Sequence, residues 1–319
     1  MFDSDLSLRE VLGLTDSAAR EAWLALKGDP ILPGSRFGPS SLRIMTPRLA
    51  AATWRGQRPL GRRIPVFNLF NRTPTPVEQG WSVRVTQVRD FRGKGLSYDS
   101  HNGTDFAIPP GTRVVAAAPG VVVARRSEYN RGGLKLYVDH GEGLMTSYNH
   151  LARALVAPGD VVTRGQPLAL SGYSGLDALA SLGAVAPHLH FNVYLGGVQV
   201  DPFAAEGECS LWQGGLNRPL PARDAEPAAR PTRFVDSAVA ELLRGLRDEK
   251  RRSVLAAIDD PLRRGWELVI EANTYPTRFA VPEAARALFS TCERAPRLNL
   301  PFSGDDFDEV AFADEVGLR

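Results

Sequence analysis

The sequence predicts a mainly β central domain, an open, barrel-like antiparallel sheet, with α-rich extensions on its N-terminal and C-terminal sides. Short stretches of β-branched and aromatic residues, separated by Gly and Pro turns, fill the middle of the 319-residue chain. This pattern is typical of antiparallel sheets, whereas apolar residues at helical spacing occur near the two ends. We therefore expect four units: a helical lead with an Arg/Pro-rich arm (1–77), the central domain (78–205), a linker (206–233) and an α-rich appendage with an acidic tail (234–319).

The lead contains two helix signals. Ser7 and Glu10 have the spacing of a capping box, and Gly13 ends that first helix. Asp16 is expected to cap a second helix that runs to Leu26 and ends at Gly28.

The arm that follows is strongly basic. Residues 30–77 hold eight arginines and no acidic residue, with frequent Pro and Gly. We interpret the segment as a solvated, extended arm in preference to an anion-contact surface. Two Thr-Pro steps at 73–76 mark its boundary.

Regular strands are expected across the central domain. Gly196-Gly197 between two alternating segments is a strong hairpin signal. The expected strands are 81–88, 113–117, 121–124, 134–139, 145–150, 166–171, 188–195 and 198–200.

The C-terminal part reads as helical. Prolines at 219, 221, 227 and 231 indicate a linker, and Asp236 is expected to cap a helix with apolar residues at helical spacing. A strand at 266–270 and a helix opened by Pro282 follow. The acidic tail interleaves Phe307, Val310 and Phe312 with carboxylates, so we expect it to dock on the arginine-rich arm.

Four of the five histidines cluster in three short pieces with one aspartate. His188 and His190 lie two apart in an apolar strand and so project to one face. Gly103 suits a turn that brings His101 and Asp105 together in a loop. Two imidazoles and a carboxylate, from His101, Asp105 and His190, make a ligand set for one catalytic Zn²⁺. Tyr148 and His150 alternate onto one face, which would aim His150 into the same groove as His188.

The order His-x-x-x-Asp, Tyr-x-His-Leu, His-Leu-His-Phe and Val-Asp-Pro over residues 98–203 resembles the lysostaphin-type zinc endopeptidases, which cut peptide bonds in bacterial peptidoglycan. The resemblance implies a zinc metallo-endopeptidase with His101, Asp105 and His190 as ligands. It makes His150 and His188 the unligated catalytic histidines, and His140 a turn or core residue. It implies a peptidoglycan peptide as substrate, with either a D-Ala–diamino acid bond or a Gly-rich bridge as the bond that is cut.

The chain departs from that family at two places. Residues 172–187 form a longer and more apolar loop, in which Leu176, Leu179, Leu182 and Val185 recur every three residues. We expect a short amphipathic helix that gates the groove. Asn192 also stands where the family commonly carries Glu.

Two other functions remain open. A non-catalytic relative would bind and activate another wall hydrolase, although such scaffolds lose metal ligands and this chain keeps them. A biotinyl or lipoyl carrier domain would need a lysine in an exposed hairpin, and that lysine is missing.

Composition narrows the partners further. A net charge of +2 gives no argument for nucleic-acid binding, and no stretch is apolar enough for a membrane span. The substrate class implies the cell envelope or periplasm, although residues 1–10 lack the apolar run of a secretory signal. Cys209 and Cys292 allow at most one bridge, and oligomeric state is not indicated.

Overall fold

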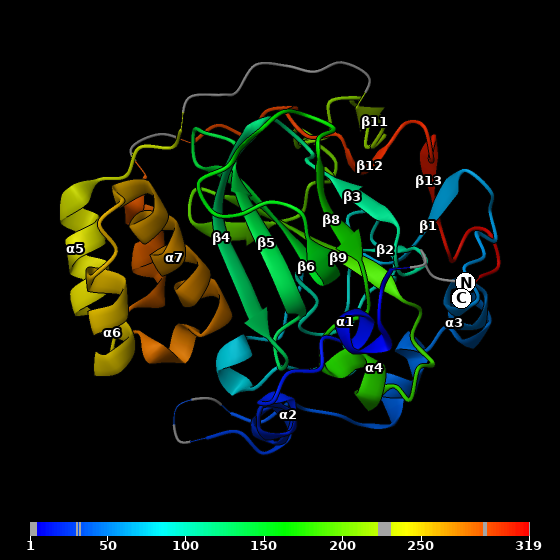
Figure 1. Ribbon diagram of the computed structural model, residues 1–319, viewed down its shortest axis with the longest axis horizontal. Helices are drawn as coiled ribbons and strands as arrows, with labels where there is room; N and C mark the ends of the chain where they lie inside the picture. Colours follow the sequence, from blue (N-terminus) through cyan, green and yellow to red (C-terminus); the bar gives the residue numbers. More distant parts are fainter. Residues whose placement is uncertain (1–4, 30, 32, 223–230, 290–291, 319) are drawn as a thin grey trace.

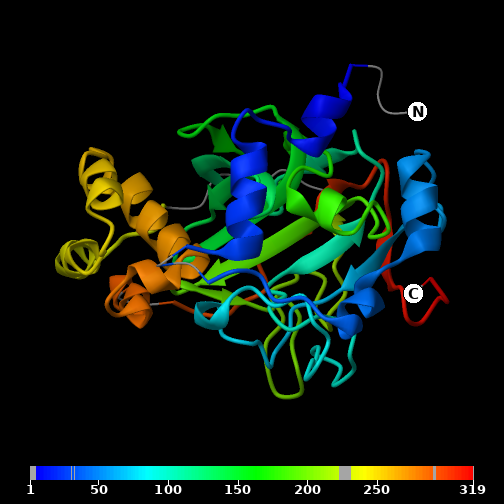
Figure 2. The same ribbon diagram turned by 90° about the horizontal axis from the view of Figure 1, so that it is seen from below.

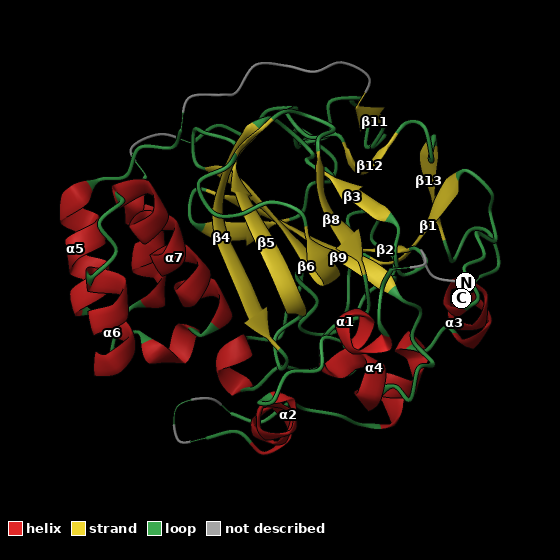
Figure 3. Ribbon diagram, viewed as in Figure 1, coloured by secondary structure: helices red, strands yellow, loops and turns green. Residues whose placement is uncertain are grey.

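A computed structural model describes residues 5–29, 31, 33–222, 231–289 and 292–318. Strands occupy its centre and helices flank them (Figure 3). The α-helices are α1 (Leu8–Leu12), α2 (Ala18–Lys27), α3 (Pro47–Trp54), α4 (Leu176–Ala180), α5 (Asp236–Arg244), α6 (Glu249–Ala256) and α7 (Pro261–Thr274). The 3-10 helices are η1 (Pro39–Ile44), η2 (Val77–Gln79), η3 (Pro276–Arg278) and η4 (Pro282–Leu288).

The strands form one large sheet and one small one. They are β1 (Arg63–Asn68), β2 (Thr104–Ala107), β3 (Arg113–Val115), β4 (Gly120–Glu128), β5 (Gly133–Asp139), β6 (Leu144–Ala154), β7 (Val161–Val162), β8 (Pro167–Ser171), β9 (His188–Leu195), β10 (Val198–Val200), β11 (Pro221–Ala222), β12 (Leu300–Ser303) and β13 (Glu309–Phe312). The large sheet has eleven strands in the main order β13-β1-β2-β9-β6-β5-β4-β7, while β11 and β12 pair separately. Its pairs are antiparallel except for β1 with β13, and the sheet is open, which confirms the predicted fold class.

The sheet separates an apolar core from a polar groove and a helical layer. Phe106, Tyr148, Leu189 and Phe191 belong to the core. On the opposite face, Tyr137 and Tyr194 pack into a second apolar cluster with α5, α6 and α7. These C-terminal helices group on one side of the sheet in both Figure 1 and Figure 2. The appendage therefore packs on the central domain.

The first two helices follow the sequence signals closely. Ser7 and Glu10 form the predicted capping box of α1, and Gly13 ends it with a left-handed φ of 64°. Gly28 ends α2 as expected, but the residue before α2 is Ser17, so the prediction of Asp16 as its cap was wrong. Asp236 likewise begins α5 instead of capping it, because Val235 occupies the cap position.

The interpretation of 30–77 as a solvated arm was wrong. The segment contains α3 and the strand β1, in which every residue after Arg63 is buried. Ile64 and Val66 enter the main core, and β1 lies between β2 and β13. Its continuous apolar run from Ile64 to Phe67 outweighs the arginines, which lie largely outside the strand.

Two predicted strands were also wrong. Residues 81–88 form no regular strand, because the carboxylate of Asp99 accepts hydrogen bonds from the Thr86 amide and the Ser82 hydroxyl. Residues 266–270 lie in helix α7, which Asp260 caps. A short apolar run does not distinguish a strand from a helix buried on several sides.

The predicted linker is partly packed as well. Leu211 and Trp212 are fully buried in the main core. Residues from all four predicted units therefore pack around one sheet. The division of the chain into these four units stays a prediction. The first four residues and Pro227 lie outside the described ranges.

The acidic tail docks on the basic segment as expected. Strand β13 pairs with β1, and the Arg62 guanidinium forms a bidentate pair with Asp308 at 2.8 Å. Arg58 contacts Asp306 and lies over the Phe307 ring, which is buried. The tail therefore combines charge pairs with apolar burial.

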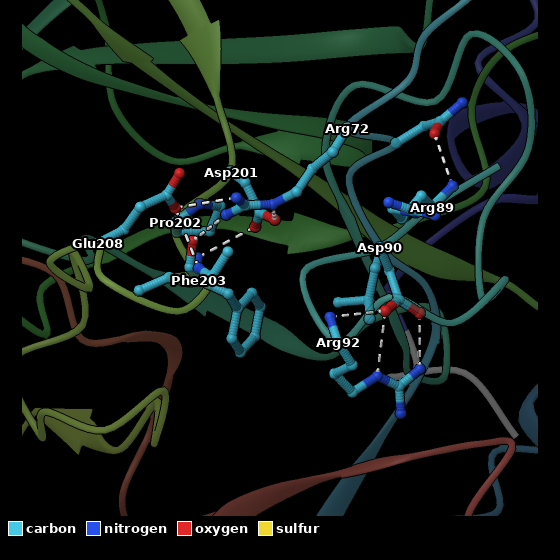
Figure 4. A network of polar contacts seen from close by, with 12 residues as sticks. Arg72, Arg89, Asp90, Arg92, Asp201, Pro202, Phe203 and Glu208 are labelled. Atoms are coloured by element: carbon cyan, nitrogen blue, oxygen red, sulfur yellow. Dashed lines mark hydrogen bonds and ion pairs between the residues drawn. The ribbon is translucent and has the colours of Figure 1, made fainter.

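A second network fixes the segment that leads to His101 (Figure 4). The Arg72 guanidinium donates to Asp201 at 2.9 Å and to Glu208 at 2.9 Å. Asp201 follows strand β10, so this contact joins the hairpin end to the long segment before β2. Burial raises the pKa of Asp201 to about 6, although Arg72 partly offsets that effect.

Cys209 and Cys292 are free and exposed, so the single bridge that the sequence allowed does not form. Within the described ranges, no helix has the length and apolar character needed to cross a membrane.

Candidate active site

Three predicted ligands converge at the junction of β2 and β9. Asp105 pairs directly with His190 across these strands, so the two side chains share a face. His101 lies in the loop before β2, and its Nε2 is 3.0 Å from Asp105 Oδ2 and 3.2 Å from His190 Nδ1. Asp105 Oδ1 lies 2.7 Å from His190 Nδ1. Asp105 therefore sits on a strand and not in the predicted loop, while the convergence itself is as expected.

Hydrogen bonds behind the cluster fix the orientation of each ligand. His101 donates from Nδ1 to the Leu69 carbonyl at 2.7 Å, which leaves the lone pair of Nε2 facing Asp105. His190 Nε2 lies 3.1 Å from Asn102 Oδ1 and 3.0 Å from Asn192 Nδ2, and in the tautomer that donates to Asn102 the lone pair stays on Nδ1. Asn68 donates to Asp105 Oδ2 at 2.9 Å. Metal-binding histidines are held in this way, with the second ring nitrogen bonded to an oxygen.

The electrostatics of the cluster favour a charged carboxylate. Burial alone would raise the pKa of Asp105, but the nearby His101, His188 and His190 hold that pKa well below its usual range. Burial also acts to lower the pKa of His101, yet Asp105 outweighs it and raises that pKa. For His190 burial prevails and the pKa is lowered.

The donor set fits zinc. Ligands at about 2.0–2.1 Å from a tetrahedral Zn²⁺ lie about 3.3 Å from one another. The three donor groups here are 2.7 to 3.2 Å apart and almost completely buried. Two imidazole nitrogens with one carboxylate are also the ligand types of catalytic zinc sites, in which one position stays open.

His188 faces the groove beside this cluster, as its spacing from His190 predicted. Its Nδ1 donates to the Ala186 carbonyl at 2.7 Å, so Nε2 carries the lone pair and lies 3.7 Å from Asp105 Oδ1. Burial lowers the pKa of His188 to about 4. The side chain is therefore neutral at pH 7.

His150 reaches the groove by a route that the sequence did not reveal. Leu136 pairs with Tyr148 and Leu134 with Leu151, so β6 carries one extra residue between these pairs. His150 has a φ of 60° at this bulge. Tyr148 points into the core, and the prediction that the two side chains share a face was wrong. The bulge turns His150 into the groove, because a one-residue insertion changes the face that later side chains occupy.

The long loop at 172–187 forms one wall of this groove. It contains α4, which confirms the expected short helix. Asp177 on α4 lies 3.3 Å from His150 Nε2, and the His150 Nδ1 donates to Ser174 O at 2.7 Å. Phe37 and Met45 from the N-terminal segment and Asn273 from α7 line other parts of the groove.

Residues 99–202 match peptidase family M23. The chain contains an M23 peptidase domain. The match covers β2 to β10, together with His101, Asp105, His150, His188 and His190.

Curated relatives of the M23 domain include both enzymes and an activator. The chain is 40% identical over 131 residues to the peptidoglycan DD-endopeptidase ShyA of Vibrio cholerae, covering 41% of this chain and 29% of ShyA. It is 39% identical over 124 residues to the murein hydrolase activator EnvC of Escherichia coli, covering 38% of this chain and 27% of EnvC. The matched segment thus spans less than a third of either relative.

Among solved structures, the catalytic domain of lysostaphin from Staphylococcus simulans is 30% identical to the chain. That likeness covers 33% of this chain and 77% of the lysostaphin domain, with a TM-score of 0.29.

Several residues around the site were missed by the sequence interpretation. Asn68 lay in the supposed arm, Asn102 stood unnoticed beside His101, and Asp177 lay in the long loop at 172–187. For Asn102 the sequence offered one signal of a role in the site, which is its position between the two predicted ligands His101 and Asp105. Asn192, noted as a departure, donates to the Asn102 carbonyl at 2.8 Å and accepts from Asn149 at 2.6 Å.

Proposed function

We propose that this protein is a zinc-dependent endopeptidase that hydrolyses peptide bonds of bacterial cell-wall peptidoglycan, in the cell envelope. One observation carries the proposal. Asp105 and His190, which form a ligand set with the buried His101, line the same groove as two histidines whose Nε2 atoms are not ligands in that set. The similarity of the M23 domain to ShyA supports the choice of substrate.

His101 and His190 would hold the Zn²⁺ through nitrogen and Asp105 through oxygen. When bound, the metal supplies a Lewis acid that polarises the scissile carbonyl and makes a water more acidic. The residues of the chain supply the proton transfers. His188 is neutral at pH 7 and its Nε2 faces the groove, so it accepts the proton of the attacking water as general base and returns it to the leaving amine as the C–N bond breaks. His150 lies beside His188, with ring centroids 4.6 Å apart, and an N–H at its Nε2 would donate a hydrogen bond to the developing oxyanion.

A second candidate is a non-catalytic activator of another wall hydrolase. The similarity to EnvC favours it. The retained ligands and both groove histidines argue for the enzyme instead, because an activator has no need of a metal site.

Digestion of defined muropeptides by the purified, zinc-loaded chain tests the proposal. We expect new peptide ends by mass spectrometry, and none from the His190→Ala variant. An activator would leave the muropeptide intact when it acts alone. It would also make a separate wall hydrolase digest the muropeptide faster than that hydrolase does by itself, and these two results together would establish the activator instead.

A further inference from the structure

The groove contains an arginine that forms no ion pair with the described residues of the chain. Arg131 lies in the turn between β4 and β5, and it lines the same groove as His150 and His188. Its Nη1 donates to the Asn130 carbonyl at 3.1 Å. Its Nε is buried and has no hydrogen-bond partner among the described residues.

The carboxylate of Glu128, near Arg131, has other partners. Glu128 accepts from Lys135 at 2.6 Å and from the Tyr275 hydroxyl at 2.9 Å. In the described part of the chain, no carboxylate lies within ion-pair distance of Arg131. Burial lowers the pKa of Arg131, and Tyr275 and Glu128 offset that effect only in part.

The basic residues near Arg131 are paired with carboxylates, which is the ordinary arrangement for a buried cation. Arg126, on the adjoining strand, is buried against Glu267 and Glu271. Lys135, the other basic residue that lines the groove, has Glu128 as its partner. The Arg131 guanidinium lies 5.8 Å from the Tyr275 ring centroid but has no carboxylate partner among the described residues. A partly buried cation without a counter-ion is costly, and such charges are retained where a ligand supplies the counter-ion.

The turn that carries Arg131 is fixed against the catalytic strand. The amide of His150, at the bulge of β6, donates to the Gly132 carbonyl at 2.9 Å. Arg131 directly precedes Gly132 in the chain. Gly133 has a φ of 64°, and a Cβ there would lie 2.2 Å from Ser174 Oγ. Glycine is therefore required, and the turn holds a defined position beside His150.

We propose that Arg131 binds a free carboxylate of the peptide substrate and thereby selects acidic stem peptides over uncharged Gly-rich bridges. The inference rests on the proposed endopeptidase function and adds the substrate class to it. A guanidinium matches a carboxylate through charge-assisted N–H···O bonds, and Nη2 of Arg131 has no acceptor among the described residues and supplies such donors. A neutral peptide would leave Arg131 without its partner.

Two cross-linked peptides of the same sequence provide the test. In one the diamino acid at the scissile bond carries a free carboxylate, and in the other it carries a carboxamide. We expect the wild-type chain to prefer the carboxylate by about 10- to 100-fold in kcat/KM, mainly through KM. Arg131→Gln should remove that preference while zinc content stays the same.

Matched variants separate recognition from folding. Arg125→Gln makes the same change at an exposed position on β4 that does not line the groove, and it should keep the full preference. Arg131→Lys keeps the positive charge but loses the paired N–H donors of the planar guanidinium, so an intermediate preference is expected. Equal cleavage of both peptides by the wild-type chain, or a preference that survives in Arg131→Gln, would overturn the inference.

Binding distinguishes this inference from the proposed function. If neither peptide is cut, the endopeptidase function fails, yet titration calorimetry of the zinc-loaded chain with each peptide still measures the carboxylate preference. Tighter binding of the free carboxylate, lost in Arg131→Gln, would then support Arg131 as the recognition residue. Equal affinities would reject it.

Discussion

The centre of the sheet and its β13 edge are held together in different ways. At the centre, β2, β9 and β6 place Asp105, His190 and Asn149 opposite one another, and all three side chains are buried. At the edge, β13 pairs with β1 over four residues, and the Arg62–Asp308 pair beside it is exposed. Exposed pairs contribute only about 0–1 kcal/mol each, so the edge depends on buried Phe307 as well. Changes at the centre should therefore alter chemistry, and changes at the edge should alter local stability alone.

Removal of a metal ligand should have the largest effect. His190→Ala or Asp105→Ala leaves two of three ligands, so we expect a metal-depleted protein without activity. Metal analysis of the purified variants by mass spectrometry checks this. A variant of His190 that keeps its zinc, beside a variant of His188 that loses it, would reverse the assignment of the two histidines.

Removal of a proton carrier should separate activity from metal binding. His188→Ala and His150→Ala are expected to retain close to one zinc and to lose activity by about 10²-fold or more. Peptide hydrolysis and metal content measured on the same samples decide the point. Near wild-type turnover in His150→Ala would show that His150 takes no part in the mechanism.

Replacement of the α4 loop should have a smaller effect. Residues 176–184 exchanged for a short Gly/Ser linker remove Asp177 from His150 and widen the groove. We expect higher turnover on small peptides with unchanged zinc content. Equal or lower turnover in a folded variant would mean that the loop does not gate the groove.

Deletion of the tail should affect the edge alone. Without residues 304–319, β1 loses β13, and Arg58 and Arg62 lose their partners. Trypsin is expected to cut within 30–77 faster, while the zinc content of the chain stays the same. Higher salt should act partly in the same direction, because exposed charges are screened over about 8–10 Å. An unchanged cleavage rate would show that the tail does not restrain this segment.

The sequence predicted the site better than the edges of the fold. Alternation along a strand is a local property, so His188 and His190 were placed correctly. The bulge that redirects His150 depends on pairing between β5 and β6, which one strand does not encode. His150 thus reached the predicted groove for a different reason.

The remaining errors share a cause in long-range packing. Strand β1 was hidden among arginines whose partners are more than 240 positions away, at 306 and 308. Helix α7 was taken for a strand because its apolar face contacts both the sheet and other helices. Asn68 supports Asp105 from a segment that gave no catalytic signal.

The pairing of β1 with β13 has a consequence for synthesis of the chain. The strands that carry the metal ligands are complete at residue 195, whereas β13 begins only at residue 309. While the intervening residues are being made, β1 is an open strand beside a nearly finished sheet, available to pair with another nascent chain. We therefore expect chains arrested on the ribosome before residue 309 to associate with one another more readily than chains arrested after residue 312 has emerged.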